Sequence, residues 1–258
     1  MPTGETLLSY IKSQDKEELQ ASFDAITETN IRQLKKKRKL CRSVPIAIDW
    51  HDIMYYGDPK TPMVIGTQHK KGAHYVYEYL TTSVLVDGER IVLVVTPVSS
   101  RAFVSQFSIA IIRRLTEQLG IRIKYVTLDG GFFTIDMLRF LEESGLKYIL
   151  HMPSTSKTKR MRLWHGRRFR YRTNHNSVGP NKQAEFDVAV AYDKAKKYTY
   201  LLATNMKYDA DTLLELFMKR WGIETSYRMS NQFLVKTTSK NYIVRLFYYL
   251  LACIVYNA

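Results

Sequence analysis

Three acidic residues occupy positions where a carboxylate is unusual. Asp49 follows the apolar residues 46–48, and Asp129 follows the β-rich residues 125–128. A carboxylate that closes an apolar strand loses hydration, and a divalent cation is the usual compensation. Glu224 lies in a third segment, which has helical character. Two adjacent strand ends and one helix can therefore gather three carboxylates around two Mg²⁺ ions about 4 Å apart.

Each aspartate alone also fits a purely structural role. Aspartate is common in turns and at helix N-caps, and Asp129 precedes Gly130 and Gly131, a pattern typical of a turn. The metal-site interpretation therefore depends on the fold bringing all three carboxylates together.

The elements that would position these residues alternate between strands and helices. Strand patterns cover residues 44–50, 74–86, 90–98, 124–128 and 147–152. Helical periodicity covers residues 103–119, 135–143, 209 to about 235, and 241–258. This order predicts an α/β domain in which a hairpin sheet is extended by parallel strands.

Two further segments differ from this core pattern. Residues 5–40 have helical spacing and end in the basic run 35–39, which is typical of a solvated helix face or of a contact with the DNA backbone. Residues 154–205 form a mainly β insertion. We therefore expect a helical N-terminal segment at 1–43 and a catalytic domain at 44–258 that carries this insertion.

The charge balance indicates a polyanionic partner. The chain has 39 Lys and Arg against 24 Asp and Glu, a net charge of +15. Such a surface attracts DNA or RNA, although basic charge can also serve solubility alone. In the insertion, aromatic rings lie among arginines, which suits stacking on distorted DNA; a solvated hairpin is the alternative. The insertion residues expected to contact DNA are Arg160, Arg162, Trp164, Arg167, Arg168 and Arg170.

The remaining composition argues for a cytoplasmic protein. Cys41 and Cys253 are isolated, which supports neither a disulfide framework nor a zinc site and fits a reducing compartment. The N-terminus does not have the pattern of a secretory signal. The longest apolar stretch, residues 246–256, is too short to span a bilayer as a helix, so no membrane partner is expected.

The three acidic neighbourhoods resemble the catalytic motifs of DDE-type insertion-sequence transposases. The third motif of that group reads Tyr, two residues, Arg, three residues, Glu, six residues, Lys. Arg220 and Glu224 keep the Arg–Glu spacing, whereas Phe217 stands in place of Tyr and Asn231 in place of Lys. The resemblance covers residues 44–258.

The other two motifs are similar as well. Asp129-Gly130-Gly131-Phe132 resembles the second motif, which is Asp, any residue, Gly, aromatic. The segment around Asp49 resembles the opening strand. The resemblance implies a ribonuclease-H-like mixed sheet flanked by helices, with a β-rich subdomain inserted before the last catalytic helix.

The resemblance also implies roles for the site residues. Asp49, Asp129 and Glu224 would ligate Mg²⁺ or Mn²⁺, as two ions that activate water or a DNA 3′-hydroxyl for in-line attack on a phosphodiester. Arg220 lies one helical turn before Glu224, where it can grip a phosphate or pair with Glu224. Phe217 and Asn231 are expected at DNA-binding positions together with Arg220. Phe217 has no hydroxyl to donate to a phosphate, and Asn231 can donate a hydrogen bond but supplies no positive charge.

The activity implied is DNA strand cleavage and strand transfer during transposition. The resemblance further implies contacts with transposon ends and target DNA, a homodimer in the DNA complex, and association with the nucleoid when DNA is bound. Two alternatives stay open. One is a ribonuclease-H-like nuclease or resolvase without strand transfer, and the other is a catalytically inactive, transposase-derived protein that only binds DNA.

Overall fold

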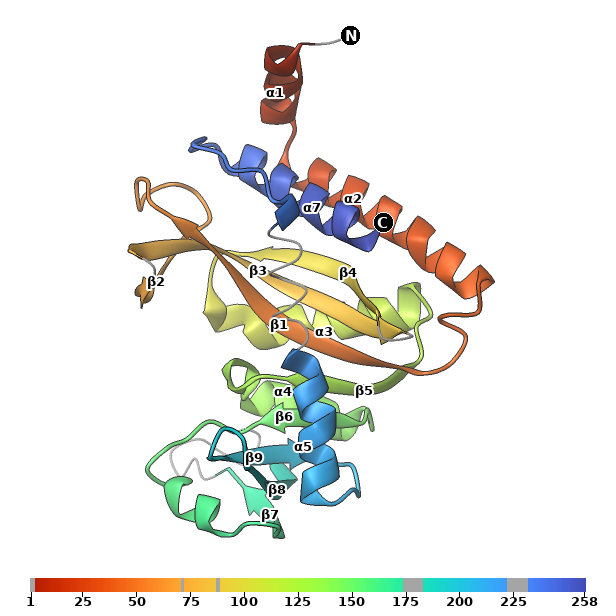
Figure 1. Ribbon diagram of the computed structural model, residues 1–258, viewed down its shortest axis with the longest axis vertical. Helices are drawn as coiled ribbons and strands as arrows, with labels where there is room; N and C mark the ends of the chain where they lie inside the picture. The colour runs from red at the N-terminus through yellow and green to blue at the C-terminus, as the bar shows by residue number, and fades with distance from the viewer. Residues whose placement is uncertain (1–2, 71, 87–88, 174–182, 222–231) are drawn as a thin grey trace. The chain divides into compact units, whose positions relative to one another are not determined.

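The chain forms two compact units (Figure 1). The computed structural model describes residues 3–70, 72–86, 89–173, 183–221 and 232–258. The first unit comprises Met1–Arg42, Trp50–Ala102 and Ile223–Ala258, and the second comprises Ser43–Asp49 and Phe103–Gly222. Strand β1, Val44–Tyr55, begins in the second unit and ends in the first.

The first unit combines helices with an antiparallel sheet. Its helices are α1 (Gly4–Ser13), α2 (Lys16–Lys36) and α7 (Tyr242–Asn257), and its own strands are β2 (Val64–Lys70), β3 (Ala73–Val86) and β4 (Glu89–Val98). β2 pairs with the beginning of β3 and β4 with the rest of it, and β1 is the next strand in the order. The strands expected at 74–86 and 90–98 are confirmed, whereas β2 was not expected.

The N-terminal helical region contains two helices where the periodicity over residues 5–40 suggested one. The break lies at Asp15, whose carboxylate accepts a hydrogen bond from the Glu18 backbone N–H at 2.7 Å. The Glu18 side chain accepts in return from the Asp15 backbone N–H at 3.1 Å. This reciprocal capping box starts a new helix, because it satisfies donors that a helix start leaves unpaired.

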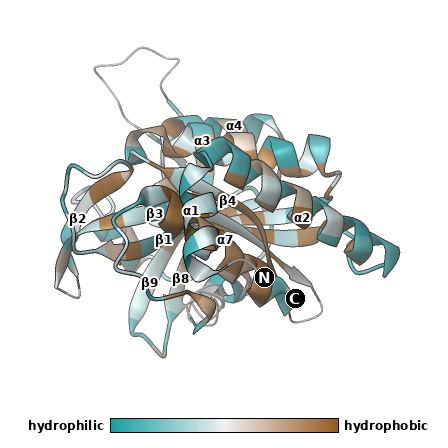
Figure 2. Cartoon of the chain, turned by 90° about the horizontal axis from the view of Figure 1, so that it is seen from above, coloured by the Kyte–Doolittle hydropathy of each residue, from teal (hydrophilic) through white to brown (hydrophobic). Residues whose placement is uncertain are grey.

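An aromatic core holds the first unit together. α2 and α7 lie side by side and both pack on β4 (Figure 1). In Figure 2 both helices carry hydrophobic and hydrophilic residues, as expected for helices with one buried face. Phe23 from α2 meets Tyr79 and Tyr249 in one buried cluster. The Asn257 side chain fastens the end of α7 to β4 through two hydrogen bonds with the Val92 backbone, at 2.7 and 2.9 Å.

The second unit contains a mixed sheet. Its strands are β5 (Ile123–Leu128), β6 (Tyr148–His151), β7 (Arg168–Arg172), β8 (Glu185–Asp193) and β9 (Tyr198–Thr204), in the order β1-β5-β6-β9-β8-β7. β1, β5 and β6 run parallel, and β9, β8 and β7 continue the sheet in antiparallel pairs. The strands of the expected insertion therefore extend this sheet.

The helices of the second unit follow the predicted order with two local differences. They are α3 (Val104–Arg113), α4 (Ile135–Glu143) and α5 (Ala210–Met218). The helix expected over 103–119 changes to a π-helical turn at Arg114–Gln118. The helix expected from 209 to about 235 is seen as α5 and a 3₁₀ turn, Lys219–Trp221, and residues 222–231 lie outside the described residues. Within the part of the chain that the structure describes, no helix is long and apolar enough to cross a membrane.

Candidate active site

Asp49 and Asp129 lie at the same edge of the second unit's sheet. β1 and β5 are parallel neighbours, with Ile48 opposite Leu128, so the residue that follows each of them falls at adjacent strand ends. Ile48 and Leu128 are themselves fully buried. The apolar strands therefore carry two carboxylates to one place.

Arg220 lies between these two carboxylates. Its Nη1 donates a hydrogen bond to Asp49 Oδ2 at 2.6 Å, and its Nη2 lies 3.8 Å from Asp129 Oδ2. The arginine side chain is only 5% exposed, and the Asp49 side chain is 12% exposed. Because an isolated buried charge is unfavourable, this shared guanidinium contributes to the compensation of both carboxylates.

His151 adds a third strand end to the site. It ends β6, next to β5, and its Nδ1 lies 3.4 Å from Asp129 Oδ1. The same oxygen accepts from the Gly130 backbone N–H at 2.7 Å and so caps the turn Gly130–Phe132. Asp129 thus has the structural role of a turn residue as well as its place beside Asp49. The sequence analysis did not single out His151, although it lies within the strand pattern at 147–152.

These contacts keep Asp129 ionised. The hydrogen bond from His151, the positive charge of Arg220 and the Gly130 N–H together lower the pKa of the Asp129 carboxyl to about 2, against the opposing effect of its burial. The native pKa is below the unfolded value, so the ionised carboxylate stabilises the folded state. This stabilisation is complete above about pH 4 and is lost as the pH falls through the folded pKa.

Asp129→Asn is therefore expected to make the free energy of unfolding less dependent on pH at acidic pH. Between about pH 4 and pH 2, the free energy of unfolding of the wild type should fall more steeply than that of the variant, because only the wild type takes up this proton on unfolding. Urea unfolding at a series of pH values measures both slopes. Parallel slopes would show that Asp129 is not held in its charged form.

The other residues of the predicted third motif are not seen beside the two aspartates. Glu224 and Asn231 lie outside the described residues. Phe217 is 1% exposed and belongs to the core cluster of the second unit. Its ring packs against Tyr200, and the Arg220 guanidinium lies 5.2 Å from the ring centroid. Phe217 therefore supports Arg220 from the core side.

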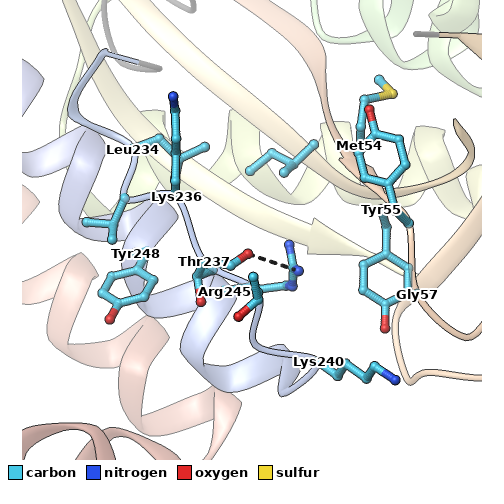
Figure 3. A pocket seen from close by; sticks show the side chains of 13 residues that line it. Met54, Tyr55, Gly57, Leu234, Lys236, Thr237, Lys240, Arg245 and Tyr248 are labelled. Carbon is cyan, nitrogen blue, oxygen red and sulfur yellow. Dashed lines mark hydrogen bonds between the residues drawn. The ribbon is translucent and has the colours of Figure 1, made fainter. Parts of the chain in front are cut away.

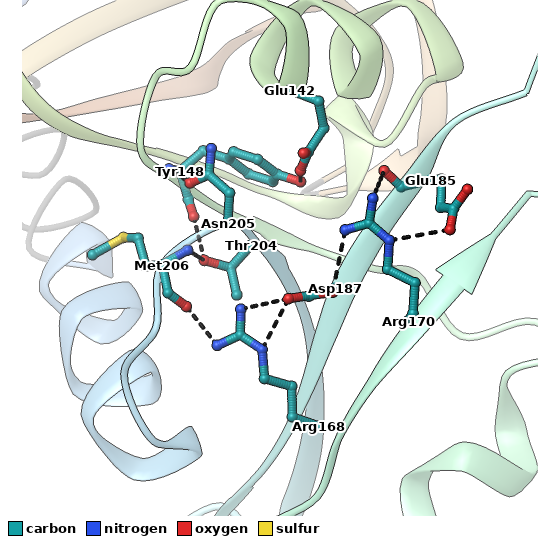
Figure 4. Close-up of polar contacts among 9 residues, drawn as sticks. All are labelled: Glu142, Tyr148, Arg168, Arg170, Glu185, Asp187, Thr204, Asn205 and Met206. Carbon is teal, nitrogen blue, oxygen red and sulfur yellow. Dashed lines mark hydrogen bonds and ion pairs between the residues drawn. The ribbon is translucent and has the colours of Figure 1, made fainter.

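Three of the insertion's six arginines, all of them on β7, pair with carboxylates, and two of these three are shown in Figure 4. On β7, Arg168 pairs with Asp187 at 2.9 Å and also donates to the Met206 carbonyl at 2.6 Å. Arg170 pairs with both Glu185 and Asp187, which lie on the neighbouring strand β8. These acids follow the basic residues 160–172 in the sequence, so the arginines alone did not indicate these ion pairs.

A smaller basic surface remains in the insertion. Arg160 and Arg167 are exposed and, among the described residues, their side chains have no partner. Trp164 is 42% exposed and touches Phe169 edge to face. Arg162 instead donates to the Tyr198 hydroxyl and stacks on its ring at 4.5 Å. Among its described residues, the insertion thus presents two arginines that are both exposed and unpaired, Arg160 and Arg167, and one exposed indole, Trp164.

The described residues fit a divalent cation in part. Asp49 and Asp129 supply hard oxygen ligands, which Mg²⁺ and Mn²⁺ prefer, and these oxygens already surround one positive group. Arg220 Nε and His151 Nε2 are buried, and neither has a hydrogen-bond partner within the described part of the chain. No group of three or more potential metal ligands occurs among the described residues, which exclude Glu224.

The fold is shared with a solved transposase structure. The chain is similar to the piggyBac transposase in its synaptic complex with hairpin DNA, with a TM-score of 0.59 and 12% identity over 94% of this chain and 53% of that chain. The chain therefore spans about half the length of that protein. This likeness establishes the ribonuclease-H-like fold that the sequence analysis predicted.

Two structures of the Mos1 transposase match more weakly. The paired-end complex with the left transposon end has a TM-score of 0.26, with 14% identity over 56% of this chain and 44% of that one. The strand transfer complex has a TM-score of 0.24, with 16% identity over 55% and 43%. No curated protein matches the chain significantly. The sequence model of the transposase DDE domain matches residues 41–258, and the chain belongs to that family.

Proposed function

We propose that residues 44–258 form the catalytic domain of an insertion-sequence transposase, which cuts and joins DNA strands with the help of divalent metal ions. Membership of the transposase DDE domain family supports this proposal. The observation that carries it is the convergence of Asp49 and Asp129 on one buried positive group, Arg220. Metal-dependent phosphoryl transfer requires carboxylates that together bind divalent cations. Two such carboxylates lie at the edge of this sheet.

Asp49, Asp129 and Glu224 would hold Mg²⁺ or Mn²⁺, as two ions. The bound metal would supply activation of water or of a 3′-hydroxyl and stabilisation of the departing oxygen in an in-line displacement. His151 and the Gly130 N–H fix the orientation of the Asp129 carboxylate. The low pKa of Asp129 keeps it available as an anionic ligand at neutral pH.

Arg220 has a second role in this proposal. It lies between the two aspartates, and divalent cations held by the same carboxylates would compete with it and release it from them. The freed guanidinium can then bind a DNA phosphate through two parallel hydrogen bonds. Arg220 would in this way link metal binding to DNA binding, because one side chain serves the carboxylates first and the phosphate afterwards.

The DNA-binding residues proposed for the insertion are Arg160, Arg167 and Trp164, whose side chains are exposed. They would contact transposon ends through phosphate pairing and base stacking. Arg162, Arg168 and Arg170 would shape this surface through their own ion pairs and stacking contacts. We expect a homodimer in the complex with DNA ends and target, working at the nucleoid in the cytoplasm.

A cleavage and joining assay tests the proposal. The protein is incubated with Mn²⁺, a labelled duplex that carries the DNA flanking its coding sequence, and an unlabelled plasmid target. We expect nicked duplex and labelled plasmid. Nicking without any labelled plasmid would favour a nuclease or resolvase. Salt-dependent binding without nicking would favour an inactive DNA-binding protein.

A further inference from the structure

A pocket of about 450 Å³ opens in the first unit (Figure 3). Residues 53–57, from the end of β1 onward, form one wall, and residues 234–238 together with Lys240 form another. Arg245 and Tyr248 of α7 complete it. Among these described lining residues there is no Asp or Glu, so every charged group that faces the pocket is positive.

Arg245 fixes the second wall in place. Its Nε donates to the Ser239 carbonyl at 2.7 Å, and its Nη2 lies 3.4 Å from the Thr237 carbonyl, the contact drawn in Figure 3. Its guanidinium also stacks on Tyr55 at 5.1 Å from the ring centroid. Because these contacts hold the loop against α7 and β1, the pocket is largely formed before any ligand arrives.

Two lysines beside the pocket have charged groups that can bind a ligand. Lys236 and Lys240 are exposed, and their ammonium groups have no partner among the described residues. They flank the segment that Arg245 holds. An ammonium group that meets solvent beside a preformed pocket can pair with a phosphate of an incoming ligand.

The first wall supplies aromatic surface. Tyr56 is 70% exposed, whereas Tyr55 is buried and bonds Thr61 through its hydroxyl at 2.8 Å. Gly57 follows them, and a Cβ at this position would collide with the Tyr55 hydroxyl. Only glycine therefore lets the chain turn here with the Tyr55 ring in place. The outcome is an aromatic wall opposite a basic one.

We propose that this pocket binds one unpaired nucleotide of a DNA strand. The volume admits a single nucleotide and excludes a duplex. The Tyr56 ring can stack on the base, and Lys236 and Lys240 can pair with the flanking phosphates. The inference rests on the proposed function in one respect, since it takes DNA to be the substrate. It adds a strand-binding site whose residues are separate from Asp49 and Asp129.

A short single strand provides the test. A tetranucleotide that contains 2-aminopurine is titrated with the full chain, and binding and fluorescence quenching are followed at several salt concentrations. For the double variant Lys236→Ala/Lys240→Ala we expect about 10-fold weaker binding. Its log–log salt slope should be shallower by about 1.4, because each phosphate contact on a single strand contributes about 0.7. Tyr56→Leu should lose the quenching and about 10-fold in affinity, with an unchanged salt slope.

The double variant Lys12→Ala/Lys194→Ala is the matched control, since it removes the same charge at two exposed positions outside the pocket. Equal weakening in this control, or wild-type binding by the pocket variants, would overturn the inference. Competition by deoxyadenosine monophosphate as strong as that by the oligonucleotide would assign the pocket to a free nucleotide and overturn it as well. If the pocket variants bind normally while Asp129→Asn loses cleavage, the pocket inference fails and the proposed function stands.

Discussion

Asp129→Asn and Asp49→Asn are each expected to lower metal-dependent DNA cleavage at least about 100-fold. Residues that merely orient a metal ligand contribute about 10–100-fold to metal affinity or activity, so a ligand itself should contribute no less. Asparagine keeps the shape of the side chain but removes its negative charge. In the proposed mechanism that charge is the attraction for the divalent cation.

The measurement is the initial rate of nicking of the labelled duplex in Mn²⁺, at protein concentrations that saturate DNA binding. Asp136→Asn is the matched control. Asp136 is an exposed residue in the first turn of α4, and its substitution makes the same chemical change away from the site. The control should cleave like the wild type. Nicking at similar rates by wild type, Asp49→Asn and Asp129→Asn would remove the basis of the proposed function.

The two aspartates could be anticipated because local sequence patterns determine where they lie. Each follows a short apolar run, and such runs become buried strands whose ends reach the sheet edge. The parallel pairing of β1 with β5 then brings the two ends together. This pairing is a long-range contact, and the sequence indicated it only through the order of strands and helices and through the family resemblance. Glu224 stays a prediction, because it lies outside the described residues.

The partners of the charged side chains were much harder to anticipate. Arg220 was expected at a phosphate or beside Glu224, four residues away, but it reaches Asp49, which is 171 residues distant in sequence. Likewise, Arg168 and Arg170 find Asp187 across a strand pair. Such contacts depend on how elements pair and pack, including strand register for β7 and β8, and a local sequence pattern does not determine this. The helix α4, by contrast, is predicted by its periodicity alone.

Arg220→Met is expected to destabilise the metal-free protein by about 3 kcal/mol, the lower end of the range for removing one partner of a buried ion pair. The lower end applies because Asp129 is 46% exposed and can be hydrated, whereas Asp49 is left with a buried charge. At roughly 2–4 °C per kcal/mol, the thermal midpoint should fall by about 6–12 °C. Arg139→Met, which removes an exposed pair with Glu143, should change stability by less than about 1 kcal/mol.

Divalent cations should reverse this loss. If Arg220 occupies the position of a cation between the aspartates, its removal lets Mn²⁺ bind without displacing a competing charge. A cation present at 100 times its dissociation constant stabilises the folded state by about 2.7 kcal/mol. The midpoint of Arg220→Met should therefore rise more on addition of Mn²⁺ than that of the wild type, in the absence of any DNA.

A double variant separates this explanation from a simple packing defect. Arg220→Met combined with Asp49→Asn also removes the buried charge that has lost its hydrogen bond from Arg220, so it should be more stable than Arg220→Met alone and should respond little to Mn²⁺. The coupling between the two substitutions measures the interaction, because the residues are in direct contact. A packing defect would leave the double variant less stable than either single variant and would make Mn²⁺ equally ineffective in both. That outcome would show that Arg220 supports the fold without competing for the metal position.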